Sequence, residues 1–99
     1  MTIGADLCVP PSHPSLAGHF PGEPIVPGVL LLSLALERLR EQRGPFETVG
    51  LRSVKFLRPL RPGERFGVEA EERAPGVLRF VCRSCGELLA EGSVQISPA

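Results

Sequence analysis

Residues 18–36 read Gly-His-Phe-Pro-Gly-Glu-Pro-Ile-Val-Pro-Gly-Val-Leu-Leu-Leu-Ser-Leu-Ala-Leu and join two halves of different character. The first half is a loop stiffened by proline and glycine that carries one histidine, His19. The second half is an apolar run that is too long for a typical strand. The stretch therefore predicts a rigid loop that leads directly into a buried helix.

The junction between loop and helix has the chemistry of a carbonyl-binding site. Pro27 suits the first helical position because the missing N–H costs nothing there, and Gly28 leaves its own N–H uncovered by a side chain. Free amides at a helix start attract a negative or polarised oxygen. If His19 lies nearby, it faces the bound carbonyl, which is the geometry for removing a proton beside a thioester or ketone.

The rest of the chain predicts an α+β domain. The helical pattern runs from Pro27 to about Gln42, is stopped by Gly44-Pro45, and is apolar almost all round in its first two turns, which we expect to be surrounded by protein. A change of phase near Arg52-Ser53 indicates a bulge. Alternating apolar residues predict strands over 2–9, 47–58, 65–71, 78–83 and 88–96. A meander of antiparallel strands that curls around one long central helix buries all of these apolar faces.

Length and composition narrow the function classes. The 99 residues predict one domain, 1–99, and the balanced charge argues against nucleic acid as the main partner. We expect no membrane span, because the apolar run is far shorter than the roughly 20 residues required, and a cytoplasmic location. The three cysteines predict reduced, structural thiols, and no metal site is expected because further zinc ligands do not cluster near Cys82 and Cys85.

The segment His19-Phe20-Pro21-Gly22-x-Pro24-x-x-Pro27-Gly28-Val29-Leu30 resembles the FabZ/FabA family of 3-hydroxyacyl-[acyl carrier protein] dehydratases, which have the hot-dog fold. A weaker similarity covers residues 51–64 and 86–96. The short chain and residues 13–18 resemble the ApeI-like branch of that family. The resemblance implies one long central helix wrapped by a curved antiparallel β-sheet, in agreement with the pattern of apolar residues.

The resemblance also implies a site at a dimer interface. His19 matches the family histidine, which exchanges the proton at C2 of the acyl thioester, and the Gly28 amide matches the group that polarises the thioester carbonyl. Phe20, Pro27 and Val29 are the corresponding candidates for substrate binding, in a tunnel that runs along the helix. The family carboxylate, which serves the departing C3 hydroxyl, lies five residues after the glycine.

Ser33 occupies that carboxylate position, and a serine hydroxyl has no useful acidity near pH 7. Three explanations compete. In the first, Glu37, one helical turn further on the same face, brings a carboxylate near the site, although it is equally a solvated residue. In the second, a related subunit supplies the acid. In the third, activity is lost, which leaves a subunit that binds acyl chains or supports an enzyme.

The resemblance implies acyl carrier protein as partner, together with a homodimer or a heterodimer of related hot-dog subunits, and no cofactor. A basic patch on the second strand and the turn after it is a candidate docking surface for that acidic protein, and equally a solvated strand face: Arg52, Lys55, Arg58 and Arg61. The predicted activity is the reversible loss of water from a 3-hydroxyacyl thioester. A non-catalytic or half-site subunit and an acyl thioesterase are the alternatives.

Overall fold

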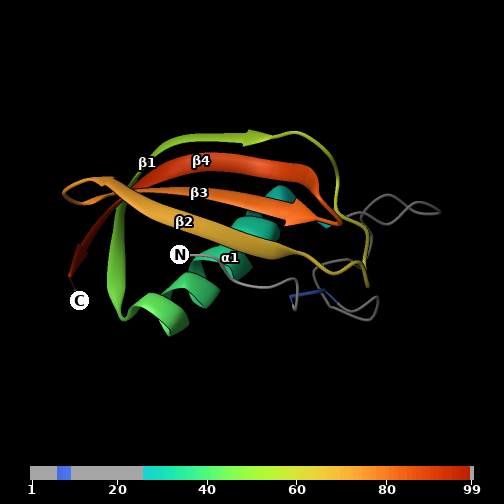
Figure 1. Ribbon diagram of the computed structural model, residues 1–99, viewed down its shortest axis with the longest axis horizontal. Helices are drawn as coiled ribbons and strands as arrows, with labels where there is room; N and C mark the ends of the chain where they lie inside the picture. Colours follow the sequence, from blue (N-terminus) through green and yellow to red (C-terminus); the bar gives the residue numbers. More distant parts are fainter. Residues whose placement is uncertain (1–6, 10–25, 99) are drawn as a thin grey trace.

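One helix and four strands form the part of the chain that the computed structural model describes, residues 7–9 and 26–98 (Figure 1). The elements follow one another as α1 (Gly28–Arg43), β1 (Phe46–Phe56), β2 (Gly67–Ala74), β3 (Val77–Ser84) and β4 (Glu87–Pro98). The strands form one antiparallel sheet in the order β1-β4-β3-β2. The helix lies across one face of this curved sheet, so the predicted α+β hot-dog architecture is confirmed. The predicted meander is wrong for β1, which pairs with β4 and not with β2, the next strand along the chain.

The helix begins one residue later than predicted. Pro27 is its N-cap, with φ −58° and ψ 139°, and its carbonyl accepts hydrogen bonds from the amides of Leu30 at 3.0 Å and Leu31 at 3.1 Å. Gly44 ends the helix as predicted. Its φ of 110° is one that glycine adopts without strain, and its amide donates to the carbonyl of Arg40 at 3.0 Å.

Tight turns set the register of the sheet. Cys85 and Gly86 alone join β3 to β4, and both have positive φ, 50° and 81°, as a two-residue hairpin loop requires.

Of the strand predicted over residues 2–9, only 7–9 are described. In that part Leu7 forms a single antiparallel bridge to Phe66, just before β2.

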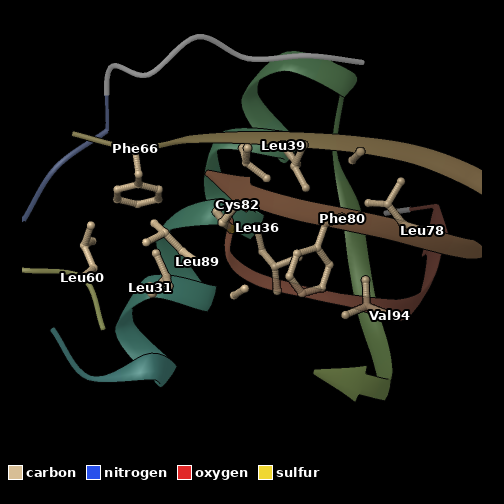
Figure 2. Close-up of a cluster of buried hydrophobic side chains, with 14 of the residues drawn as sticks. Leu31, Leu36, Leu39, Leu60, Phe66, Leu78, Phe80, Cys82, Leu89 and Val94 are labelled. Carbon is tan, nitrogen blue, oxygen red and sulfur yellow. The ribbon is translucent and has the colours of Figure 1, made fainter. Parts of the chain in front are cut away.

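The core lies between α1 and the concave face of the sheet (Figure 2). The helix contributes Leu31, Leu36 and Leu39, which lie on one face and are 3%, 8% and 0% exposed. Side chains from all three of the strands β2, β3 and β4 pack against that face, together with residues beside β2: Leu60, Phe66, Val68, Leu78, Phe80, Leu89 and Val94. Burial of this apolar surface is the main force that holds helix and sheet together.

The described part of one chain surrounds the first two turns of α1 on one side only, which is less than the sequence predicts for the assembled protein. Val29 is 76% exposed, and Ser33 and Glu37 are also exposed, one and two helical turns further along the same side. The reason is geometric: one sheet covers only one side of a helix that is apolar almost all round. This bare side, defined by Val29, Ser33 and Glu37, is hereafter the open stripe of the helix.

The predicted bulge in β1 is confirmed. The register between β1 and β4 shifts between Leu51 and Ser53, and a second shift lies between Thr48 and Gly50. Beside the shift between Leu51 and Ser53, β1 approaches β4 so closely that a Cβ atom on Gly92 would lie 2.3 Å from the carbonyl oxygen of Ser53. Only glycine fits at this crossing.

Replacement of Gly92 with alanine is therefore expected to destabilise the fold by about 1–3 kcal/mol, the usual cost of overpacking a well-packed site. Thermal unfolding followed by circular dichroism measures this change. Gly50→Ala is the matched control, because its Cβ would meet only the flexible end of the Gln95 side chain. A Gly92→Ala protein that melts at the same temperature as the Gly50→Ala protein would contradict the close approach of the two strands.

Candidate functional site

The start of α1 opens into a pocket with a volume of about 440 Å³. One wall comes from the helix start and the other from the end of β1 and the segment after it: Val26, Gly28, Val29, Leu31, Phe56, Leu57, Arg58, Pro59 and Leu60. Most of these side chains are apolar, as in sites for small organic ligands. The helix start therefore faces a space that an acyl group can occupy.

The amide of Gly28 is the polar group that the helix start offers to this pocket. Pro27 provides no side-chain cap, and among the described residues no group accepts a hydrogen bond from the Gly28 amide. An amide at this position also carries the partial positive charge of the helix dipole. No described residue therefore occupies this amide, and its role in polarising a carbonyl oxygen stays a prediction.

The ring of Phe56 lies over Gly28. A Cβ atom on Gly28 would be 2.8 Å from Cζ of Phe56 and 2.9 Å from Cε1, so the position requires glycine as long as the ring stays there. Phe56 is itself 50% exposed and forms part of the pocket wall. The sequence did not predict this contact, which depends on how the end of β1 reaches the helix.

The open stripe of the helix leads away from the pocket. At 1.5 Å per residue, Ser33 lies about 7.5 Å and Glu37 about 13.5 Å along the helix axis from Gly28. Helical side chains lean toward the N-terminus, so a glutamate at position 37 leans back toward Ser33. The structure thus confirms that Ser33 and Glu37 share one exposed face, with Glu37 further from the pocket.

A network of ion pairs and hydrogen bonds fixes the segment after β1. Arg58 holds Glu64 through two parallel hydrogen bonds, Nη1 to Oε1 at 3.1 Å and Nη2 to Oε2 at 2.6 Å, and donates from Nε to Glu87 at 2.9 Å. Glu64 also accepts from the amide of Arg61 at 3.2 Å and from Ser84 Oγ at 2.8 Å. Such bidentate pairs are both strong and geometrically defined.

The network lowers the pKa of Glu64 from 4.5 to about 2. The largest cause is the hydrogen bond from Arg58, helped by those from the Arg61 amide and Ser84, while partial desolvation acts in the opposite direction. The same contact with Glu64 raises the pKa of Arg58. The Glu64 carboxylate is therefore ionised at neutral pH.

A pH dependence of stability follows from the Glu64 pKa. Because the folded pKa lies below the unfolded one, the stabilisation is fully present above about pH 4.5 and is lost as the pH falls toward 2. We expect the wild-type protein to melt at a higher temperature than Glu64→Gln at pH 6, with the difference shrinking between pH 4.5 and pH 2. Melting curves of both proteins across this range measure it, and a constant difference would refute the assignment.

The structure places only part of the predicted site. His19 and Phe20 lie outside the described residues. Gly28 and Val29 meet at the pocket, and Pro27 caps the helix beside them.

The predicted docking patch loses one member. Arg52, Lys55 and Arg61 are exposed, and none of their side chains forms an ion pair within the described part of the chain. Arg58 differs from that prediction, because its guanidinium is occupied by Glu64 and Glu87. The sequence did not reveal this, because Glu87 reaches Arg58 only through the pairing of β1 with β4.

Two further observations concern metals and membranes. Within residues 7–9 and 26–98, no three His, Cys, Asp or Glu side chains lie close enough to bind a metal ion, and the three cysteines are free thiols. The described helix is too short and too polar to cross a membrane.

The family model described as ApeI dehydratase matches residues 1–93. The chain belongs to the ApeI-like dehydratase family.

Curated relatives agree with this assignment. The 3-hydroxyacyl-[acyl-carrier-protein] dehydratase FabZ of Acetivibrio thermocellus is 35% identical over 100 aligned positions, which cover 87% of this chain and 67% of that protein. FabZ of Haemophilus influenzae is 33% identical over 96 positions, covering 84% and 65%. The chain therefore spans about two thirds of the length of these relatives.

Solved structures share the fold. The dehydratase heterocomplex ApeI:P from Xenorhabdus doucetiae superimposes with a TM-score of 0.79 at 23% identity, over 91% of this chain and 81% of that one. A thioesterase from Thermus thermophilus, complexed with coenzyme A and zinc, superimposes with a TM-score of 0.55 at 21% identity, over 76% and 66%. At these identities the similarity establishes the fold alone.

Proposed function

We propose that the protein catalyses the reversible dehydration of 3-hydroxyacyl thioesters carried by acyl carrier protein, at a site completed by a second subunit. The observation that carries this proposal is the uncapped Gly28 amide at the mouth of an apolar pocket. Family membership supports it, because the curated relatives are named as dehydratases of this substrate class.

The reaction needs three groups. The Gly28 amide polarises the thioester carbonyl, which makes the C2 proton more acidic. His19 accepts that proton, the electrons of the C2–H bond form the C2=C3 double bond, and the C3–O bond breaks. An acid then protonates the departing hydroxide, and the products are water and the trans-2-enoyl thioester.

We propose that the acid comes from the second subunit rather than from this chain. Ser33 is exposed at the family's acid position and offers no proton of suitable pKa, while Glu37 lies about 6 Å further along the helix axis. The similar Xenorhabdus structure is a dehydratase heterocomplex, which supports a partner subunit for this chain as well. Glu37 as the acid is the competing explanation.

Two surfaces of the chain support a dimer. β1 is one of the two edge strands of the sheet, and among the described residues it pairs only with β4. Large apolar side chains on and just after this strand are exposed: Val49, Leu51, Phe56 and Leu57. An unpaired edge strand with exposed apolar side chains favours pairing with another chain. The same pairing would cover the open stripe of the helix only if the partner helix lies alongside it.

Docking of the carrier protein is assigned to Arg52, Lys55 and Arg61. These side chains are exposed and, within the described residues, unpaired, so they are free to meet an acidic helix surface. Arg58 is omitted because its charge is already balanced by Glu64 and Glu87.

Intact-mass spectrometry of 3-hydroxyacyl-loaded carrier protein incubated with the chain tests the activity, and the reverse hydration is run in parallel. Loss of one water that is absent with His19→Ala supports the dehydratase. Release of free acid would instead identify a thioesterase. The proposed activity is refuted only if both the folded wild-type chain and its Ser33→Glu variant, which supplies the acid, fail to convert the substrate.

A further inference from the structure

The end of β1 and the segment that follows it contact the start of α1 at two points. The Phe56 ring lies over Gly28, at the 2.8 Å approach given above, and the carbonyl of Leu60 accepts a hydrogen bond of 2.8 Å from the amide of Val26. Gly28 and Val26 flank the N-cap of the helix. The position of residues 56–60 therefore determines where the helix start can lie.

Arg58 lies midway between these two contacts and fastens the segment to the sheet. Its two hydrogen bonds to Glu64 close a loop over residues 58–64, and Glu64 in turn is held by the hydroxyl of Ser84, a buried residue at the end of β3. The amides of Leu57 and Arg58 both donate to the carbonyl of Leu89 in β4, at 2.8 and 3.3 Å. The anchor is thus connected to two core strands.

We propose that the Arg58–Glu64 ion pair is a positioning unit for the thioester-binding amide of Gly28. This inference rests on the function proposed above. Arg58 belongs to the pocket wall and Glu64 does not. The ion pair fixes this wall, and the wall fixes the helix start through Phe56 and Leu60. Displacement of a positioning contact by about 1 Å is enough to reduce a rate by roughly 100-fold, so a rigid anchor at this distance from the reacting carbonyl matters.

A purely structural role makes a different prediction. Another ion pair lies at the far end of the helix, between Arg43 of α1 and Glu72 of β2, and Glu72 also accepts a hydrogen bond from the Gly76 amide at 3.1 Å. Glu72→Gln removes this ion pair without changing a residue of the pocket. If both ion pairs are purely structural, both variants lose stability and neither changes the environment of Gly28. If the Arg58–Glu64 pair is a positioning unit, Glu64→Gln also changes the environment of Gly28, and Glu72→Gln does not.

The test compares wild type, Glu64→Gln, Glu64→Asp and Glu72→Gln by two measurements on the full chain. The first is the amide resonance of Gly28 in the ligand-free, ¹⁵N-labelled protein. The second is the Kd for 3-hydroxyoctanoyl-pantetheine amide, a stable analogue of the thioester. We expect Glu64→Gln to shift the resonance and to weaken binding about tenfold, the size of a lost charge-assisted hydrogen bond. Glu64→Asp keeps the negative charge, so its Gly28 resonance and its Kd are expected to lie between those of the wild type and those of Glu64→Gln.

The proposal is overturned if the Gly28 resonance and the Kd of the Glu64→Gln protein are the same as those of the Glu72→Gln protein. Failure of the proposed function has a different signature: the wild-type chain then does not bind the amide at all. In that case the Gly28 resonance of the free protein still decides whether the ion pair positions the helix start. If Glu64→Gln is too unstable to study, Glu64→Asp provides the same comparison with a smaller expected shift.

Discussion

Replacement of Ser33 with glutamate is expected to raise the dehydration rate of the chain alone by roughly 10²- to 10⁴-fold, the usual contribution of general acid catalysis. Ser33 is exposed on the open stripe of the helix, so a larger side chain has room there without repacking the core. The added carboxylate restores the group that serves the departing hydroxyl in a homodimer. Intact-mass spectrometry of the 3-hydroxyacyl carrier protein over time measures the rate.

Ser33→Gln is the control, because it has the shape of glutamate without the acid. Glu37→Gln separates the competing explanation. If the wild-type chain is already fast and Glu37→Gln abolishes its activity, then Glu37 is the acid and the partner hypothesis is wrong. Equal rates for Ser33→Glu and Ser33→Gln would show that position 33 does not face the reacting C3 hydroxyl.

Replacement of His19 with alanine is expected to lower the rate of the Ser33→Glu protein by roughly 10²- to 10⁴-fold, because the C2 proton then has no base. Binding should persist, since the Gly28 amide and the apolar pocket still hold the thioester. The expected signature is therefore a loss of kcat with little change in the Kd for the pantetheine amide.

His13→Ala is the matched control, because His13 is the only other histidine in the sequence. It should retain the full rate of the Ser33→Glu protein. A His13→Ala protein as impaired as His19→Ala, or a fully active His19→Ala protein, would remove His19 from the mechanism.

The pattern of apolar residues was sufficient to predict one helix against antiparallel strands, but not the strand order, in which β1 pairs with β4. The helical pattern from Pro27 to about Gln42 predicted the helix to within one residue at each end, and the change of phase near Ser53 predicted the bulge that the register of β1 and β4 confirms. These features are local. Periodicity and glycine–proline punctuation report them directly, whatever the tertiary structure.

Contacts between distant segments could not be predicted in the same way. Arg58 was one of four basic residues in a candidate docking patch, and the sequence did not indicate that its charge is balanced by Glu64 and by Glu87, which is 29 residues away in the sequence. The ring of Phe56 over Gly28 is a similar case. Such contacts arise from strand pairing and from the bulge, and no spacing along the chain encodes them.

The exposed side of α1 is a third case, and it has a different cause. An apolar surface on all sides of a helix predicts burial but does not say which chain provides the cover. In the single chain the sheet covers one side, and Val29 on the other side is 76% exposed. The sequence thus predicted the requirement for a cover, and the described part of one chain does not provide it on the side of Val29.

The central claim is that His19 of one subunit works with helix position 33 of another, and subunit mixing tests it most directly. The wild-type chain carries the base without the acid, and His19→Ala/Ser33→Glu carries the acid without the base. Each protein alone should be nearly inactive toward 3-hydroxyacyl carrier protein, and a refolded equimolar mixture should dehydrate it at up to about a quarter of the Ser33→Glu rate, since half of randomly paired dimers are mixed and each holds one complete site. A mixture no faster than its components, while Ser33→Glu is active, would contradict a site shared between subunits.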